Sequence, residues 1–227
     1  MNQLNDENKF NGFPKDFINF LFFLHINNTV DMLEKNKSEF KRLITAPQIR
    51  LFNALIPSVL AVSETVVIKP AKCVSSMYSD MRFSRNRPLK EYIYIRFREP
   101  FSKTDILGLY FDMGSENYSY GIRIYNQTSA GMDRIREYLV KNIRISAETL
   151  KRTEKTNAAF IGEKYAKDRY AGIKDRTLND FLNRRSLYIG VNRGINESVF
   201  SAELCREISD TFIGLAEIYQ LIKNALY

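Results

Sequence analysis

The sequence predicts an α+β fold in which an antiparallel sheet of about four to six strands packs against N-terminal and C-terminal helices. Two patterns indicate this fold. Apolar residues recur at helical spacing near both ends of the chain, and they alternate with polar residues in its middle. The composition is that of a globular protein, because 44% of the 227 residues are hydrophobic and 26% are charged.

We expect one domain over residues 12–227, preceded by a flexible N-terminus over residues 1–11. A chain of 227 residues is long enough for one large domain, and no linker divides it. The domain is predicted to have three parts: residues 12–62 are helical, residues 63–126 form mainly antiparallel strands, and residues 127–227 are mainly helical with one late strand.

The first helix is expected to follow Pro14, because proline suits the first turn of a helix. Residues 17–24 are apolar nearly all round, so this helix should be buried. Asn27 and Asn28 end it. Thr29 is then the expected cap of a second, more charged helix.

The sheet is predicted from alternating segments. Residues 92–98 alternate between apolar and polar side chains, which is typical of a strand with one core face and one polar, basic face. Strands are also expected at residues 107–112 and 118–125, and the short connections make all three antiparallel neighbours. Shorter strands are predicted at residues 66–68, 74–79 and 187–191.

Helical spacing returns in the C-terminal part. We expect helices from Ser129 and from near Ser146, and a short helix over residues 178–182. Residues 151–176 are polar and irregular. From Ser201 onward an amphipathic stripe indicates a final helix that caps the core.

The positive charge is concentrated in one segment. The chain carries 34 Lys and Arg against 26 Asp and Glu, a net charge of +8. Residues 82–103 hold seven of these cations and only two acids, so most of the excess is local. Such a patch suits phosphates, nucleic acid or an acidic protein, and the sequence does not choose between them.

Cysteine and histidine are too sparse for a disulfide framework or a structural zinc site. Cys73 and Cys205 lie far apart in the sequence, and His25 is the sole histidine. We therefore expect no metal and no cofactor. The apolar run at residues 17–24 is too short to cross a bilayer, and the N-terminus has no basic segment or cleavage site. A cytoplasmic protein without a membrane partner is expected.

The familiar catalytic motifs are missing. The sequence has no G-x-S-x-G elbow, Walker A loop, H-E-x-x-H helix or Rossmann glycine fingerprint. His25 follows an apolar helix and suits a helix-end contact better than a general base. Asp80 is the one carboxylate that stands out, because it precedes Arg82 and could orient it. Whether the protein is an enzyme stays open.

An anion-binding site is predicted around the segment Arg-Phe-Ser. Residues 81–90 contain four cationic side chains, which repel one another unless an anion lies nearby. Arginine forks bind phosphate and carboxylate groups in a bidentate manner, and the polar faces of the predicted strands supply further arginines. The predicted ligand-binding residues are Arg82, Ser84, Arg85, Lys90, Arg96, Arg123 and Tyr125.

Two other interpretations of these residues remain. The arginines could instead pair with acids across the sheet, as exposed pairs worth about 0–1 kcal/mol; the candidate acids are Glu91, Glu99, Asp112 and Glu116. Tyrosines of the sheet could stack bases beside the cations, as in RNA-binding sheets. Tyr92 and Tyr94 suit this role, whereas Tyr118 and Tyr120 share a face with Ile122 and suit the core.

Several of these segments together resemble the bacterial family called domain of unknown function 2461. Its members begin with a buried helix, an Asn-Asn step and a charged helix. An R-D-x-R-F-S-x-D-K-x-P-Y-K-like segment, a Gly-rich strand and closing helices follow. The corresponding segments here are residues 23–28, 35–37, 78–90 and 120–125, and the resemblance runs over roughly residues 12–225.

The resemblance implies an α+β fold and no particular reaction. This sequence departs from the family pattern at Asn86, which replaces the acidic residue, and at Leu89, which replaces the tyrosine. Of the glycines in the Gly-rich strand, only Gly121 is present.

The leading hypothesis is a domain that binds an anionic small molecule or an acidic group through the arginine-rich site. The first alternative is an enzyme that uses the same basic pocket, with an acid or base such as Asp80 or Tyr125. The second is nucleic-acid binding. The sequence predicts neither the ligand nor the oligomeric state.

Overall fold

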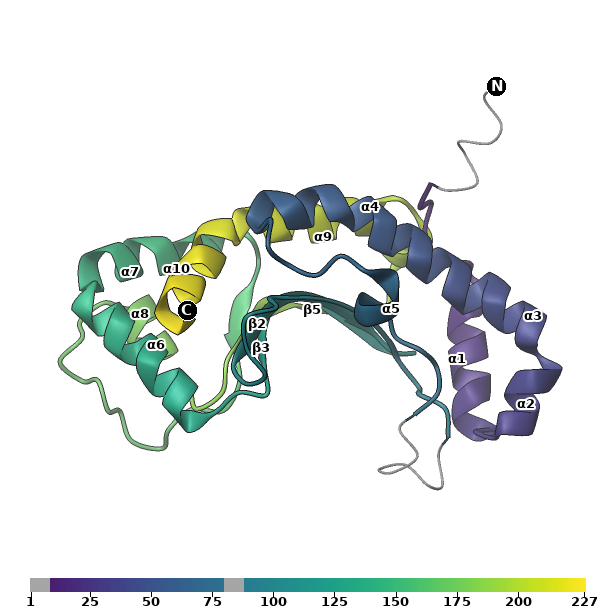
Figure 1. Ribbon diagram of the computed structural model, residues 1–227, viewed down its shortest axis with the longest axis horizontal. Helices are drawn as coiled ribbons and strands as arrows, with labels where there is room; N and C mark the ends of the chain where they lie inside the picture. Colours follow the sequence, from purple (N-terminus) through teal and green to yellow (C-terminus); the bar gives the residue numbers. More distant parts are fainter. Residues whose placement is uncertain (1–8, 80–87) are drawn as a thin grey trace.

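The computed structural model describes residues 9–79 and 88–227. Figure 1 shows an arch with a sheet at its centre, long helices above the sheet and a group of helices at each side. The predicted α+β class is confirmed.

The sheet is antiparallel, with five described strands in the order β1-β2-β3-β5-β4. The predicted pairing of the three central segments is confirmed, and the late strand β5 returns to lie beside β3. The short strand β4 was not predicted, because it lies in the polar segment 151–176. The strands are β1 (Ile93–Arg98), β2 (Ile106–Met113), β3 (Asn117–Tyr125), β4 (Ala159–Ile161) and β5 (Tyr188–Gly194).

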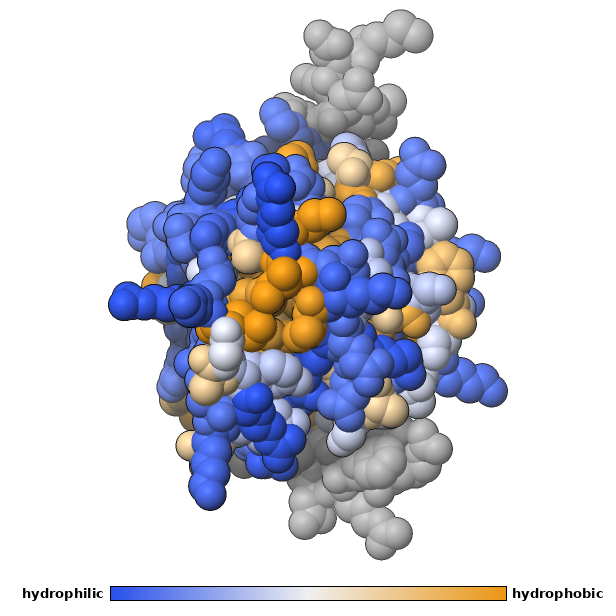
Figure 2. Space-filling view, turned by 90° about the vertical axis from the view of Figure 1, so that its left-hand side faces the viewer, coloured by the Kyte–Doolittle hydropathy of each residue, from blue (hydrophilic) through white to orange (hydrophobic). Residues whose placement is uncertain are grey.

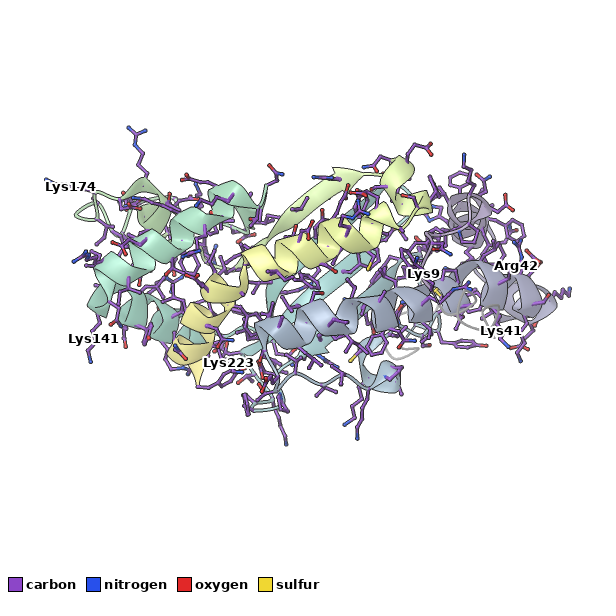
Figure 3. All side chains as sticks on the ribbon, turned by 90° about the horizontal axis from the view of Figure 1, so that it is seen from above. Lys9, Lys41, Arg42, Lys141, Lys174 and Lys223 are labelled. Atoms are coloured by element: carbon purple, nitrogen blue, oxygen red, sulfur yellow. The ribbon has the colours of Figure 1, made fainter. Side chains whose placement is uncertain are left out.

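Two helices cover one face of the sheet, α4 (Ala46–Val62) and α9 (Glu203–Gly214), and α10 (Ala216–Leu226) continues from α9 toward the helices at one side of the arch. Seen from above in Figure 3, α4 and α9 lie side by side over the strands. The single final helix predicted from the sequence is thus two helices, α9 and α10. Both carry the expected apolar stripe into the core.

The core lies between these helices and the inner face of the sheet. Alternation along β1 buries its apolar side chains, as predicted. On β3, Tyr118 and Tyr120 are both fully buried, so their predicted place in the core is confirmed. The buried apolar side chains that α4 and α9 contribute to this core include Leu51, Leu55, Val59, Leu204, Ile208 and Phe212.

Helices α1 (Asp16–Ile26), α2 (Val30–Lys35) and α3 (Lys37–Phe40) form one side of the arch (Figure 1). Thr29 caps α2 as predicted, because its Oγ1 accepts a hydrogen bond of 3.2 Å from the Met32 amide. The prediction that α1 is buried all round is wrong. Its inner side chains are buried, but Phe22 and Phe23 are 57% and 41% exposed.

Helices α6 (Ser129–Lys141), α7 (Ile143–Leu150) and α8 (Arg176–Leu182) form the other side. Figure 2 views this side and shows apolar side chains gathered among charged ones. Val140 and Ile145 are large apolar residues of this segment that remain exposed.

Two short strands expected before the sheet are absent from the described residues. Residues 66–68 are irregular, and in residues 74–79 only Val74 and Tyr78 form isolated bridges. A single turn, α5 (Pro70–Cys73), lies between them, because Pro70 favours the start of a helix.

The helical run Lys37–Val62 is 26 residues long and apolar enough to span a membrane by length and composition. It was not predicted from the sequence. Half of its most apolar window is buried within the protein. Residues 1–8 lie outside the described residues, and the predicted flexible N-terminus stays a prediction there. Phe10 is buried and packs edge-on against Phe13.

Candidate functional site

The outer face of the sheet is polar, aromatic and basic. The strand register places Arg96 opposite Tyr110, Asp112 beside Tyr94, and Arg123 between Gly108 and Tyr188. None of the described helices lies across this face in Figure 1. We call it the basic face and define it as Lys90, Tyr94, Arg96, Arg98, Tyr110, Asp112, Arg123, Tyr125 and Tyr188.

Two glycines allow tyrosine side chains to lie close to the strands of the basic face. A Cβ atom on Gly108 would lie 3.2 Å from the Tyr125 ring and would overlap a backbone oxygen of β1. A Cβ atom on Gly190 would lie 2.8 Å from the Tyr110 hydroxyl. The rings therefore occupy space that any other residue at these positions would fill.

The guanidinium groups of Arg96 and Arg123 meet around Asp112. The distance from Arg96 Nη2 to Asp112 Oδ1 is 3.8 Å, and that from Arg123 Nη1 to Asp112 Oδ2 is 3.6 Å. All three side chains are between 22% and 28% exposed. These separations are too long for hydrogen bonds, so the carboxylate lies between the two cations without a tight bond to either.

Tyrosine rings hold both guanidinium groups. Arg96 lies 3.7 Å from the centroid of the Tyr94 ring, and Arg123 lies 4.3 Å from that of Tyr188. The Tyr125 ring contacts both, with centroid distances of 5.4 and 5.3 Å. Stacking of this kind fixes the plane of an arginine and leaves its N–H edges available.

Several buried polar atoms of the basic face lack a hydrogen-bond partner in the described part of the chain. They are Nε of Arg96, Oδ1 of Asp112 and the hydroxyl of Tyr125. Buried polar atoms are nearly always paired in folded proteins, so such a cluster is typical of a site that receives another group.

Burial changes the acid–base properties of this face. It raises the pKa of the Asp112 carboxyl, although the charges of Arg96 and Arg123 act in the opposite direction. Burial also raises the pKa of Tyr110 to about 12 and that of Tyr125 further. Both hydroxyls are therefore protonated at neutral pH and could donate hydrogen bonds.

Positive charge exceeds negative charge on the basic face. Lys90 donates to the backbone oxygen of Ser76 at 2.7 Å, and Arg98 donates to that of Lys72 at 3.2 Å, so neither cation meets an acid through these contacts. Burial, followed by the charge of Arg96, lowers the pKa of Lys90. Four described cations thus face a single carboxylate.

The acids proposed as alternative partners lie mostly elsewhere. Glu99 is buried on the helix-covered side, where Lys223 lies 2.9 Å away. Glu91 lies 2.7 Å from the His25 ring at the end of α1, which is the helix-end contact expected for this histidine. Asp112 is the acid that reaches Arg96 and Arg123.

A small hollow of about 140 Å³ lies at the β1 edge of the basic face. The polar and charged residues that line it are Lys72, Cys73, Arg96, Arg98 and Glu99. Burial raises the pKa of the Cys73 thiol to about 11, and its Sγ donates to the backbone oxygen of Val67. The thiol is thus protonated at neutral pH and is not an activated nucleophile.

The structure places four predicted site residues on this face: Lys90, Arg96, Arg123 and Tyr125. The other three predicted residues, Arg82, Ser84 and Arg85, lie outside the described residues, as does Asp80. Within the described ranges, no three His, Cys, Asp or Glu side chains are grouped to hold a metal ion.

Sequence reasoning missed Tyr188 and the central position of Asp112. Tyr188 was assigned to a late strand whose neighbour was unknown, and its place opposite Arg123 follows from the β3–β5 register. The pattern Tyr188-x-Gly190-x-Asn192 contained the available signal, since alternate residues of a strand share a face.

Comparison with known proteins gave one result. Residues 16–220 match the family model described as "Conserved hypothetical protein (DUF2461)". A search of curated proteins found no match to the chain. The family model covers well over half of the sequence, so the resemblance inferred from the motifs is confirmed and the protein belongs to the DUF2461 family.

Proposed function

We propose that the protein binds an anionic small molecule or an acidic group on the basic face of its sheet. One observation carries the proposal. Arg96 and Arg123 converge around Asp112, while Lys90 and Arg98 add positive charge beside them.

A bound anion would balance the positive charge of the four cations, which the carboxylate of Asp112 neutralises only in part. The arginines are largely shielded from water, so the repulsion between them is screened less than at an open surface. Each charge-assisted hydrogen bond to a bound phosphate or carboxylate contributes roughly 1.5–3 kcal/mol. The rings of Tyr94 and Tyr188 support the proposal, because they hold the guanidinium groups in fixed planes before a ligand arrives.

The segment Arg82, Ser84 and Arg85 belongs to the same proposal. It precedes Lys90 by five to eight positions in the sequence, and Lys90 lies 5.4 Å from the Tyr94 ring on the basic face. We propose that these three side chains contribute to the same anion site.

Nucleic-acid binding is less well supported. A tyrosine that stacks a base needs an open ring face. The Arg96 guanidinium already lies over Tyr94, and Tyr188 is similarly occupied by Arg123. Tyr92 is 44% exposed and remains available, but one ring makes a small stacking platform.

Among the described residues of the basic face, the candidate acid–base groups for an enzymatic role are Asp112, which lies between two guanidinium groups, and Tyr125. Burial raises the pKa of Tyr125, so its hydroxyl stays protonated at neutral pH and does not act as a base. We therefore propose binding rather than catalysis. We further propose that the protein acts in the cytoplasm, because Cys73 and Cys205 are free thiols of the kind that a reducing compartment preserves.

Thermal unfolding with added phosphate, nucleotides and di- or tricarboxylates tests the proposal. A ligand at one hundred times its Kd stabilises the folded state by about 2.7 kcal/mol, which a melting curve detects. The variants Arg98→Gln and Arg123→Gln should lose the stabilisation. Arg144→Gln is the matched control, because Arg144 is 89% exposed on α7, away from the basic face.

Two results would contradict anion binding at this face. One is that no anion stabilises the wild-type protein more than the Arg123→Gln variant. The other is that the Arg144→Gln control loses the ligand effect equally. Affinity for single-stranded RNA that falls steeply with salt would favour the nucleic-acid alternative instead.

A further inference from the structure

A larger pocket lies on the opposite, helix-covered side of the sheet. It has a volume of about 360 Å³ and is bounded by β3, β5, α9 and the 3₁₀ turn η2 (Lys151–Lys155). Its charged lining comprises Arg152, Lys155, Arg193, Glu207 and Asp210. This volume lies within the range of small-molecule sites.

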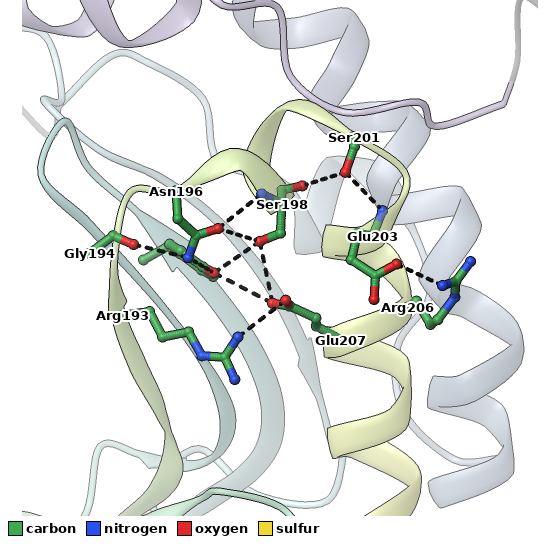
Figure 4. Close-up of polar contacts among 9 residues, drawn as sticks. Arg193, Gly194, Asn196, Ser198, Ser201, Glu203, Arg206 and Glu207 are labelled. Atoms are coloured by element: carbon green, nitrogen blue, oxygen red, sulfur yellow. Dashed lines mark hydrogen bonds and ion pairs between the residues drawn. The ribbon is translucent and has the colours of Figure 1, made fainter.

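Arg193 and Glu207 form a fixed pair in the wall of the pocket. Figure 4 shows Arg193 extending from β5 toward Glu207 on α9, and the two side chains are 3.1 Å apart. The hydroxyls of Tyr118 and Ser198 each lie 3.4 Å from the same carboxylate. Asn196 in turn accepts a 2.7 Å hydrogen bond from Ser198. Side chains held in this way are positioned before a ligand binds.

The neighbouring surface of the pocket is also polar. Tyr120 lines it, and burial raises the pKa of its hydroxyl to about 12, although the positive charge of Arg193 acts in the opposite direction. Thr211 lines the pocket as well. Both hydroxyls could therefore donate to an anionic group at neutral pH.

Two opposite charges in the pocket remain uncompensated by the described residues. Arg152 already pairs with Glu217 at 2.8 Å, and Arg193 pairs with Glu207. Lys155 and Asp210 line the same pocket, yet no ion pair joins them to each other or to a further described side chain. The pocket therefore presents one unpaired ammonium and one unpaired carboxylate.

We propose that this pocket binds a small zwitterion of the amino-acid class. Lys155 and Arg193 attract the carboxylate of the ligand, and Asp210 attracts its ammonium group. A simple anion would be repelled by Asp210 and Glu207, whereas a simple cation would be repelled by the three basic residues. A ligand with both charges compensates Lys155 and Asp210 together, which favours it over either singly charged molecule.

Titration calorimetry on the full chain tests this inference with the standard amino acids, and with the N-acetyl and methyl-ester forms of any that bind. The N-acetyl form lacks the ammonium and the ester lacks the carboxylate. We expect the free amino acid to bind about ten- to hundredfold more tightly than either derivative, because each loses one charge-assisted contact.

Two variants test which residue binds the ammonium end of the ligand and which binds its carboxylate end. Asp210→Asn should weaken binding of the free amino acid and leave binding of the N-acetyl form unchanged. Lys155→Gln should weaken binding of the free amino acid and leave binding of the methyl ester unchanged. Both residues are exposed, so neither change should unfold the protein. Glu154→Gln is the control, because Glu154 is the exposed neighbour of Lys155 and does not line the pocket.

The inference is overturned if no standard amino acid binds at millimolar concentration. It is also overturned if an N-acetyl form binds as well as its parent, or if Glu154→Gln weakens binding as much as Asp210→Asn. These outcomes are independent of anion binding on the other face, because the basic face shares no residue with this pocket.

Discussion

Neutralising Lys223 should destabilise the protein strongly, because this lysine compensates a carboxylate inside the core. The Glu99 side chain is completely buried, and Lys223 Nζ lies 2.9 Å from its Oε1. Three hydroxyls donate to the same carboxylate: Ser63 at 2.7 Å, Thr65 at 2.6 Å and Tyr219 at 2.9 Å. The variant Lys223→Met keeps much of the apolar length of the side chain and removes only its charged end.

The expected loss follows from leaving Glu99 ionised without its cation. Removing one partner of a buried ion pair typically costs about 3–5 kcal/mol. The three hydroxyl donors remain, so we expect a value of about 3 kcal/mol, at the lower end of that range. In urea unfolding this corresponds to a midpoint shift of about 1.5 M, for an m-value near 2 kcal/mol per M. Lys141→Met, at an exposed position on α6, is the control and should change little.

The pH dependence provides an independent measurement. Burial tends to raise the pKa of Glu99, but hydrogen bonds from Thr65, Ser63, Lys223 and Tyr219 outweigh it and lower the pKa. The stabilisation is therefore present above the ordinary carboxyl pKa and is lost as the pH falls through the lowered value. The difference between wild type and Lys223→Met should shrink toward pH 4. A loss under about 1 kcal/mol at pH 7 would refute the reasoning, as would an equal loss at both pH values.

Three further predictions concern the site and the fold. Asp112→Asn should tighten phosphate binding about tenfold or more, because it removes a negative charge within 4 Å of two guanidinium groups. Calorimetry measures the affinity, and unchanged or weaker binding would contradict the prediction. Thr29→Ala should cost about 1 kcal/mol of unfolding free energy through loss of the α2 cap, whereas Thr29→Ser should cost much less. Gly121→Ala should lower the melting temperature by several degrees, because Gly121 has a φ of 151° and an added Cβ would lie 2.1 Å from the Ile189 oxygen. An unchanged melting temperature would show that the strands relax easily.

Much of the fold could be predicted because its elements carry strong local patterns. The strand at residues 92–98 alternates without interruption, and Thr29 is a cap residue directly before a helical pattern. The failures have local causes as well. Residues 66–68 are β-branched and apolar, yet they form no strand, because Val67 makes a single backbone hydrogen bond to Arg98 of β1 and Ile68 is exposed. The exposure of Phe22 and Phe23 depends on where neighbouring helices end, and no pattern within α1 reports that.

The candidate site was less accessible to sequence reasoning. Arg96 and Arg123 could be placed on polar strand faces by alternation alone. That Asp112 lies between them requires the registers of β1 with β2 and of β2 with β3 together. The pocket beside α9 was missed entirely. Lys155 lies in the irregular segment, and Asp210 lies on the exposed side of an amphipathic helix, where charged residues are expected for solubility alone.

Both proposed sites depend on the same pairing of β3 with β5. Arg123 lies opposite Tyr188 on the basic face, and Tyr118 lies opposite Arg193 on the helix-covered side. Residues an odd number of positions apart in a strand point to opposite faces, so Tyr188 and Arg193 must separate in this way. A shift of one residue in the register would move Arg193 out of its pocket and Tyr188 off its arginine at once. The close approach of Gly121 to Ile189 and Gly190 occurs in the same pair of strands. The tight backbone contact at Gly121 therefore restricts this register, and with it the positions of both sets of charges.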